Sequence, residues 1–263
     1  MTALEWDNVG ERFFETGVDR YVLYIPNGEN SPGVAWSGVT GIEESPGGSS
    51  TPYFLDGVKY LDAEVFGQFS GSIRAFTYPD EFEQFIGIDT DGGGLLFDDQ
   101  PHKYFHLSYR TKIGNDVDGV DHGYKIHILW NVLATPDAVT HETLGASTEP
   151  VEFSWSIVAQ PPLLVGARPT AHLILDSTDL PAGFLSQIED MLYGTSTTDA
   201  YLTSLQDLLD QLALSIVDNG DGTWTIITLS DDDITWVSPT QFEINDIDAT
   251  YLHADTYTMN TIP

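Results

Sequence analysis

Hydrophobic and polar residues alternate with a period of two over most of this chain, which is the pattern of half-buried β-strands. The clearest case is 69–77, where Phe69, Ile73 and Ala75 share one face and Ser70 and Arg74 share the other. One side of the resulting sheet is therefore expected to face water. We predict strands at 20–25, 34–42, 58–66, 69–77, 104–113, 124–134, 151–159 and 170–175, with a glycine-serine loop at 44–50.

Helical periodicity appears only late in the chain. Asp179 is suited to cap a helix at about 180–193, and Gly194 stands where a C-terminal cap belongs. A second helix is predicted at 199–212. The two apolar stripes are expected to pack against the sheet; they comprise Phe184, Ile188, Met191 or Leu192 in the first helix and Leu202, Leu205, Leu209 and Leu212 in the second.

The last fifty residues return to a strand pattern. Asn219 to Gly222 is typical of a tight hairpin turn, and short strands are predicted at 223–228, 234–237, 242–244 and 256–259. The predicted fold class is therefore mainly β with one or two flanking helices. Residues 1–212 form the main domain, and 213–263 form a small all-β module that could decorate its outside.

The net charge of −32 restricts the classes of partner. No Lys or Arg follows Arg168, although Asp and Glu continue almost to the C-terminus. A surface this acidic does not neutralise phosphates, but it keeps a crowded protein soluble and lets a polyanion pass without adhering. Adaptation to high salt remains an alternative explanation.

Other compositional features favour a soluble protein made in a cytoplasm. The chain has no cysteine, and hence neither disulfides nor a thiolate zinc site. No apolar run approaches the length of a membrane span, and the N-terminus lacks the pattern of a signal peptide.

Motifs of known chemistry are lacking, so we expect no enzyme, no cofactor and no metal. There is no G-x-S-x-G elbow, no glycine-rich phosphate loop followed by Lys and no H-E-x-x-H. The Asp-rich stretches 89–92, 116–121 and 218–222 are better explained as turns than as calcium loops, although calcium remains open. His102 and His106 are four residues apart in a strand, and the other histidines are scattered and read as structural or surface residues.

Several segments, in order, resemble the major tail proteins of long-tailed, non-contractile phages of actinobacteria, which are siphovirus-type tail-tube subunits. The likeness covers roughly 1–212, and the matching segments are 17–24, 34–44, 75–82, 108–116, 121–127, 175–178 and 192–195. None of them is a catalytic signature.

This resemblance implies a structural role and a tail-tube-type β-barrel or sandwich. Such subunits join into rings, usually hexamers, and the rings stack into a tube. Implied partners are other copies of the chain, the tape-measure protein, the tail terminator and the baseplate or tip proteins. Double-stranded DNA would pass through without specific binding. The implied location is the virion tail, assembled in the cytoplasm of the host bacterium.

The resemblance also suggests a stacking element, because in these families a long loop or hairpin between early strands joins successive rings. Our candidate is 44–68, with contacts by Tyr53, Phe54, Leu55, Tyr60 and Phe66. The alternative is that these aromatic and aliphatic residues belong to the core. Which acids would face a lumen is not indicated by the sequence.

Two other functions stay open at this point. The leading rival is a secreted carbohydrate-binding or adhesion module, and a glycosidase is third. Six tryptophans could form a sugar-binding face, but Trp130 and Trp155 lie in apolar strands and are expected in the core.

Overall fold

A computed structural model describes the chain in ten stretches: 4–45, 47–66, 68–91, 94–143, 150–165, 168–180, 182–218, 224–228, 234–238 and 241–244. At 49–50, 63–66, 182 and everything after 210 it describes the backbone alone.

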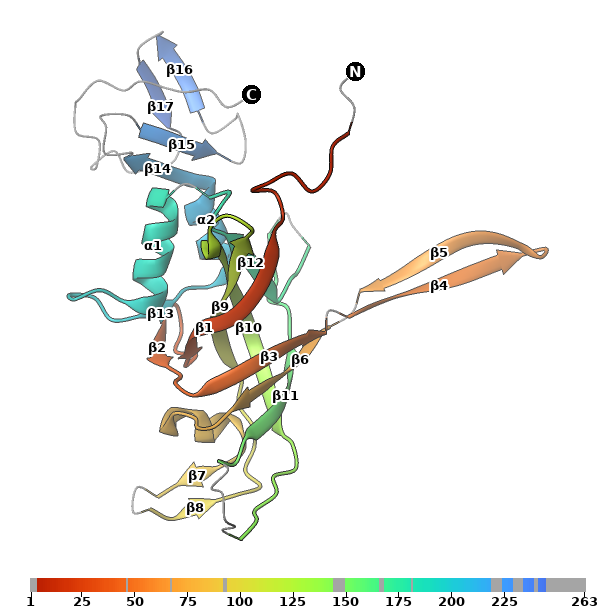
Figure 1. The fold of residues 1–263 in the computed structure, drawn as a ribbon, viewed down its shortest axis with the longest axis vertical. Coiled ribbons are helices and arrows are strands. Elements are labelled where there is room, and N and C mark those ends of the chain that lie inside the picture. The colour runs from red at the N-terminus through yellow and green to blue at the C-terminus, as the bar shows by residue number, and fades with distance from the viewer. Residues whose placement is uncertain are drawn as a thin grey trace.

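Its main feature is one antiparallel sheet of nine strands, in the order β13-β2-β1-β9-β10-β11-β6-β3, with β12 also paired to β10 (Figure 1). The expected fold class, mainly β with flanking helices, is confirmed. The strands of this sheet are β1 (Phe14–Tyr24), β2 (Ser31–Ala35), β3 (Val39–Ser45), β6 (Phe69–Ala75), β9 (Phe105–Asn115), β10 (Gly119–Pro136), β11 (Phe153–Ala159), β12 (His172–Asp176) and β13 (Tyr201–Leu202).

The sheet buries both of its faces where β1, β9 and β10 run side by side. In β1, Tyr21 and Leu23 enter one core while Val22 and Tyr24 enter another, as the two-residue period of a strand requires. The first core lies inside the curl of the sheet and is rich in aromatic rings, with Phe82 fully buried against Trp36 and Trp155. We call it the inner core. The second core lies under the helices.

The helices α1 (Ala182–Tyr193) and α2 (Leu205–Ala213) cover the second core. Phe184, Ile188 and Leu192 are buried as expected. Gly194 has φ of +75°, and its N–H bonds to the carbonyl of Asp190, which confirms it as the C-terminal cap of α1. Among the described residues, no helix has the length and apolar character that a membrane span needs.

The predicted start of the second helix is wrong. Residues 199–204 are not helical; Tyr201 and Leu202 form β13 against β2, and α2 begins at Leu205. Ser204 explains this start, because its Oγ accepts a hydrogen bond from the N–H of Asp207 (3.1 Å) and donates to the carboxylate of Asp207 (2.6 Å). This reciprocal pair caps the first turn of α2.

Two predictions near residue 40 are also wrong. The single strand expected at 34–42 is two strands, β2 and β3, which belong to opposite ends of the sheet. Gly38 lies between them with φ of +82°, and an added Cβ would meet the Thr77 side chain at 2.8 Å, so the chain turns here. The expected loop at 44–50 is largely strand, since β3 runs to Ser45 and β4 begins at Gly48.

Strand β10 changes partner along its length. Lys125 to Leu129 pair with β12, whereas Val132 to Pro136 pair with β11. Asn131 sits at the change with φ of +50°, and its N–H donates to Nδ1 of His106 (3.0 Å). This irregularity places β12 and its first residue, His172, beside the middle of β10.

Shorter elements complete the described chain. A 3-10 helix, η1 (Asp80–Phe85), follows β6, and four strand pairs lie outside the main sheet. These hairpins and ribbons are formed by β4 (Gly48–Leu55) with β5 (Val58–Phe66), β7 (Asp89–Thr90) with β8 (Leu96–Phe97), β14 (Leu214–Asp218) with β15 (Trp224–Thr228), and β16 (Ile234–Ser238) with β17 (Gln241–Ile244).

The C-terminal pairs occur where strands were predicted at 223–228, 234–237 and 242–244. The predicted turn at 219–222 and the predicted strand at 256–259 lie outside the described residues. The division at residue 213 into two domains stays a prediction.

Candidate assembly surface

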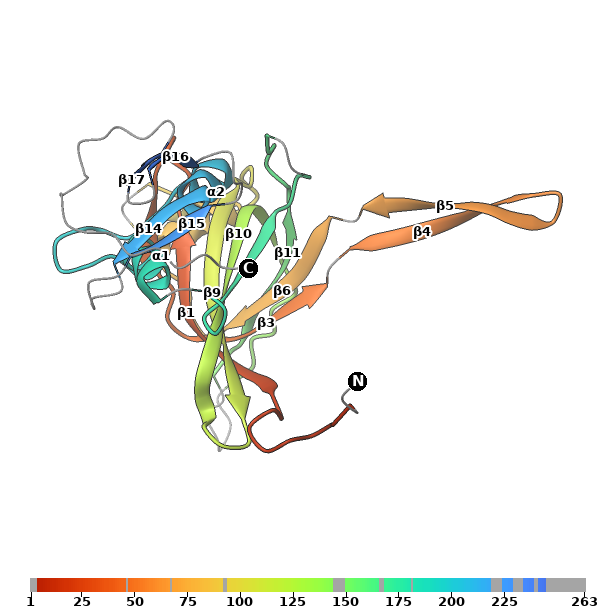
Figure 2. The ribbon, with the colours of Figure 1, turned by 90° about the horizontal axis from the view of Figure 1, so that it is seen from above.

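Strands β4 and β5 form a two-stranded arm that projects away from the sheet (Figures 1 and 2). It leaves the body at Gly48, just after β3, and returns at Phe66, just before β6. An isolated two-stranded ribbon is only marginally stable in water. Because the arm extends far beyond the sheet, we expect contact with a partner surface to stabilise it.

The tip of the arm is a two-residue turn. Leu55 pairs with Val58, and the residues between them, Asp56 and Gly57, have φ of +50° and +79°. Positive φ at both positions defines a type I′ turn, for which Asp-Gly is a favoured sequence. The segment Leu55-Asp56-Gly57-Val58 is thus the sequence signal for the arm, and our strand assignments overlooked it by starting at Val58 and leaving 51–55 unassigned.

One face of the arm tip is apolar. The cross-strand pairs Tyr53–Leu61 and Leu55–Val58 alternate with the pair Phe54–Lys59, so the first two pairs share a face. All four side chains on this face are exposed: Tyr53 by 55%, Leu55 by 62%, Val58 by 71% and Leu61 by 44%. We call these four residues the tip face.

The predicted contact residues fall on this arm but not all on the tip face. Phe54 is 63% exposed on the opposite face, and Tyr60 is 71% exposed at a point where the register shifts by one residue. The side chain of Phe66 lies outside the described residues. The alternative that Tyr53, Phe54, Leu55 and Tyr60 belong to the core is wrong, since each is more than half exposed.

Other segments, including the stretch with Leu163 and Val165, also expose apolar side chains that the sequence reasoning did not single out. Near the N-terminus these are Leu4, Trp6, Val9 and Phe13, and at the β7–β8 hairpin they are Leu95, Leu96 and Phe97. All seven are more than half exposed. Exposed apolar segments of this kind are candidate contact surfaces.

The turn at 116–121 contains the polar contacts expected of a turn. The side-chain oxygen of Asn115 accepts from the N–H groups of Val117 and Asp118, and Gly119 has φ of +66°. Asp116 accepts from the N–H of Gly10 at 2.9 Å, which fastens the N-terminal segment to this turn.

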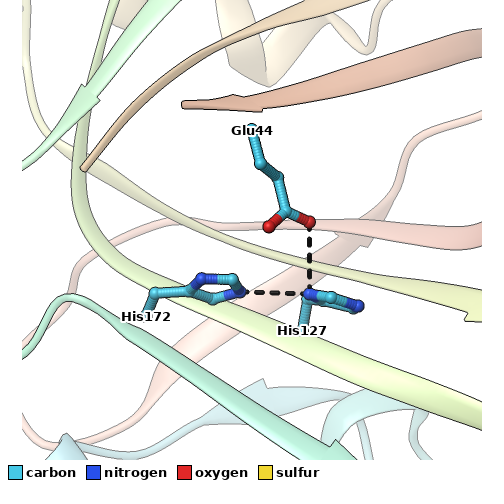
Figure 3. Close-up of side chains that lie close together, drawn as sticks. All are labelled: Glu44, His127 and His172. Atoms are coloured by element: carbon cyan, nitrogen blue, oxygen red, sulfur yellow. Dashed lines mark hydrogen bonds and ion pairs between the residues drawn. The ribbon is translucent and has the colours of Figure 1, made fainter. Parts of the chain in front are cut away.

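A polar cluster interrupts the inner core near the root of the arm (Figure 3). It consists of Glu44 from β3, His127 from β10 and His172 from β12, and we call it the inner cluster. Nδ1 of His127 lies 3.1 Å from Nε2 of His172 and 3.3 Å from Oε1 of Glu44. The sheet curls so far that its end strand, β3, reaches the middle strand, β10.

Neighbouring side chains hold the inner cluster in place. The hydroxyl of Tyr109 donates to Oε1 of Glu44 (2.5 Å), and the ring of Tyr109 stacks on His127 with centroids 4.7 Å apart. Oγ1 of Thr111 lies 3.1 Å from Nε2 of His127, and the ring of Phe69 meets His172 edge-on.

Burial disfavours the charged form of both histidines. Desolvation lowers the pKa of His127 to about 4, although the nearby charge of Glu44 opposes the shift. Desolvation likewise lowers the pKa of His172, again against the charge of Glu44. In its neutral form each ring carries one N–H and one nitrogen with a lone pair.

Sequence reasoning treated these histidines as scattered, and the structure corrects that reading for His127 and His172. They are 45 residues apart and meet only because β12 pairs with β10. The one available signal was weak: His127 interrupts the run Ile126 to Trp130, on the face opposite Ile126 and Ile128.

No protein-family model matches this chain, and no curated protein matches it. Among solved structures it is similar to components of contractile injection systems. These include the sheath-tube complex of an extracellular contractile injection system, PVC, in the extended state (12% identity, 60% of this chain and 88% of that chain, TM-score 0.29).

Two more are the tube-terminating cap of the anti-feeding prophage (9% identity, 67% and 96%, TM-score 0.31) and the PVC sheath/tube terminator (12%, 66% and 99%, TM-score 0.27). Likeness at this level establishes neither a shared fold nor a shared function. The function proposed below therefore rests on the residues of this chain.

Proposed function

We propose that this chain is a non-enzymatic structural subunit of a phage tail tube, whose copies form rings that stack through the β4–β5 arm. The observation that carries the proposal is the tip face: four apolar side chains, at the end of a projecting ribbon, that the rest of the described chain leaves uncovered. Burying them against a second copy supplies the stabilisation that the ribbon lacks alone.

Three of the segments that resemble major tail proteins lie in central strands or contribute to the inner core. Residues 75–82 connect β6 to η1 and include Phe82 of the inner core, and 108–116 and 121–127 lie mostly in the adjacent strands β9 and β10. Because these similar segments lie in the sheet and its core, they support a fold related to that of major tail proteins. Closed rings also cover sheet edges, such as β3, that would otherwise invite aggregation.

The charge supports a conducting role. A tube wall built from a chain of net charge −32 repels DNA at close approach, so the genome passes without being retained. In this proposal the rings are hexameric and the tube belongs to a siphovirus-type tail. The tape-measure protein fills the lumen during assembly, and the terminator and the tip proteins close the two ends.

The tryptophans do not favour a carbohydrate-binding module. Trp36, Trp130 and Trp155 are buried, and within the part of the chain whose side chains are described only Trp6 is exposed. Trp130 donates its Nε1–H to the carbonyl of Thr203, which fits a packing role in the core under the helices.

Negative-stain electron microscopy and sedimentation velocity of the purified chain test this function together. Rings or tubes that form as the concentration rises are the expected result. A chain that stays monomeric and binds polysaccharide would refute the proposal.

A further inference from the structure

The inner cluster brings three potential metal ligands together from three strands. Glu44 lies near the C-terminal end of β3, His127 in the middle of β10 and His172 at the start of β12. The ligand atoms of the three side chains all lie within 4.8 Å of one another. His127 is buried, while Glu44 and His172 are partly buried. Two imidazoles and one carboxylate form a ligand set typical of Zn²⁺ sites.

Two of the three ligand-atom spacings are close to those of a small tetrahedral site. Ligands about 2.0–2.2 Å from a zinc ion, at tetrahedral angles, lie about 3.3–3.6 Å from one another. Nδ1 of His127 lies 3.1 Å from Nε2 of His172 and 3.3 Å from Oε1 of Glu44. The third pair, His172 and the Glu44 carboxylate, is within 4.8 Å, so a bound ion would draw these two groups closer together.

Hydrogen bonding leaves one of the two close contacts of His127 Nδ1 without a proton. Nδ1 of His127 faces both Nε2 of His172 and the Glu44 carboxylate, yet it carries at most one proton. If that proton points to Glu44, the contact to His172 goes unfilled. If His172 donates instead, Nδ1 accepts that proton and makes no hydrogen bond to Glu44, whose Oε1 accepts from Tyr109. A cation placed among the three accepts all three lone pairs.

From this geometry we propose that Glu44, His127 and His172 bind a divalent transition-metal ion, with Zn²⁺ the best-fitting candidate, at the root of the arm. The surrounding contacts suit this role. Thr111 lies beside the second ring nitrogen of His127, and Tyr109 donates to the Glu44 carboxylate, so two of the three ligands have a partner that fixes their orientation.

A cavity next to His172 has room for water molecules, and its lining includes His172 but neither Glu44 nor His127. Its volume is about 270 Å³, and its lining comprises Gly47, Phe69, Pro161, Pro169, Thr170, Ala171 and His172. A fourth ligand from the protein is not needed, because a water molecule can complete a tetrahedron around three protein ligands.

The consequence concerns the arm. Glu44 stands four residues before Gly48, where β4 begins, while His127 and His172 belong to the body of the sheet. A metal ion at this point would tie β3 across the inner core to β10 and β12. It would thereby fix the root from which the arm projects.

The test uses the full chain, stripped with a chelator and titrated with ZnCl₂ at pH 7 by calorimetry. We expect one Zn²⁺ per chain and a rise in Tm of roughly 5–10 °C at about 100 times the Kd. Glu44→Gln and His172→Ala should each weaken binding by at least about 100-fold. His141→Ala removes an exposed histidine outside the cluster and should bind as the parent does.

Three results would overturn the proposal: no saturable site, full binding by both cluster variants, or equal weakening by His141→Ala. If a variant fails to fold, visible absorption of Co²⁺ added to the parent chain decides. Bands of a four-coordinate nitrogen-oxygen site support the proposal, and a spectrum identical to Co²⁺ in buffer rejects it. Because binding is measured on unassembled chain, its failure is distinct from failure to form tubes.

Discussion

Replacing the outer pair of the tip face, Leu55→Ser with Val58→Ser, should impair assembly without unfolding the chain. These side chains are 62% and 71% exposed and belong to neither core. Burying a whole Leu or Val side chain contributes about 1.5–3 kcal/mol, so the exposed two-thirds leaves about 1–2 kcal/mol for each. The pair is therefore worth about 2–4 kcal/mol per contact between subunits.

In assembly terms this loss weakens each arm contact roughly 30- to 700-fold. The assay is the concentration at which rings or tubes first appear, followed by sedimentation velocity and electron microscopy. Urea unfolding of the unassembled chain should change by no more than about 0.5 kcal/mol, as for other exposed positions.

A matched control keeps the apolar area at the same two positions. Leu55→Met with Val58→Ile should assemble within about threefold of the parent, because the tip face remains apolar. The reasoning is refuted if the serine pair assembles as readily as the parent, or if the control fails as badly as the serine pair.

Three further outcomes follow from other parts of the structure. Gly57→Ala should destabilise the arm by about 1–2 kcal/mol, because φ is +79° at this position and an alanine there is strained in its backbone, although its Cβ would meet no atom within 4 Å. We expect assembly to be reduced while the free energy of unfolding of the sheet and its cores stays unchanged. Asp19 accepts two hydrogen bonds from the guanidinium of Arg110 (2.7 and 2.8 Å), and these lower the pKa of Asp19. The pair therefore stabilises the folded chain above about pH 4, and this stabilisation is lost as the pH falls below that value. Asp19→Asn should therefore lower the free energy of unfolding by about 1 kcal/mol at pH 7, after allowing for partial exposure, and by less at pH 3; an equal loss at both values would contradict this linkage. Removal of 215–263 should leave tube formation intact, and loss of tubes in that truncation would show that the C-terminal strands take part in assembly.

The alternation of hydrophobic and polar residues was sufficient to predict the sheet strands in which that alternation is clear. In β11, Trp155 and Ile157 are buried while Ser156 and Val158 are exposed, as the period of two predicts. The same is true of α1, where an apolar stripe and Gly194 determine the face and the end of the helix.

Long-range pairing accounts for what the sequence did not reveal. Leu202 has the spacing of a helical stripe, but pairing with Ser31 draws it into β13 instead. The inner cluster is the extreme case: its ligands meet because β3 curls over the inner core and because β10 changes partner near Asn131. Neither the curl of β3 nor the change of partner in β10 produces a periodic pattern of hydrophobic residues in the sequence.

The arm lies between these cases. Its turn has a recognisable Asp-Gly signal, and its strands could have been predicted from it. Its exposure could not, because the same apolar residues would suit a buried hairpin equally well. Only the absence of a covering element in the described chain distinguishes the two.

The most direct test of the central claim is a cryo-electron microscopy reconstruction of the assembled chain at a resolution that shows side chains. The account predicts that the β4–β5 arm of each subunit crosses to a neighbouring copy, with Tyr53, Leu55, Val58 and Leu61 buried in the contact. An assembly in which the arm extends freely into solvent, with these four residues uncovered, would contradict it.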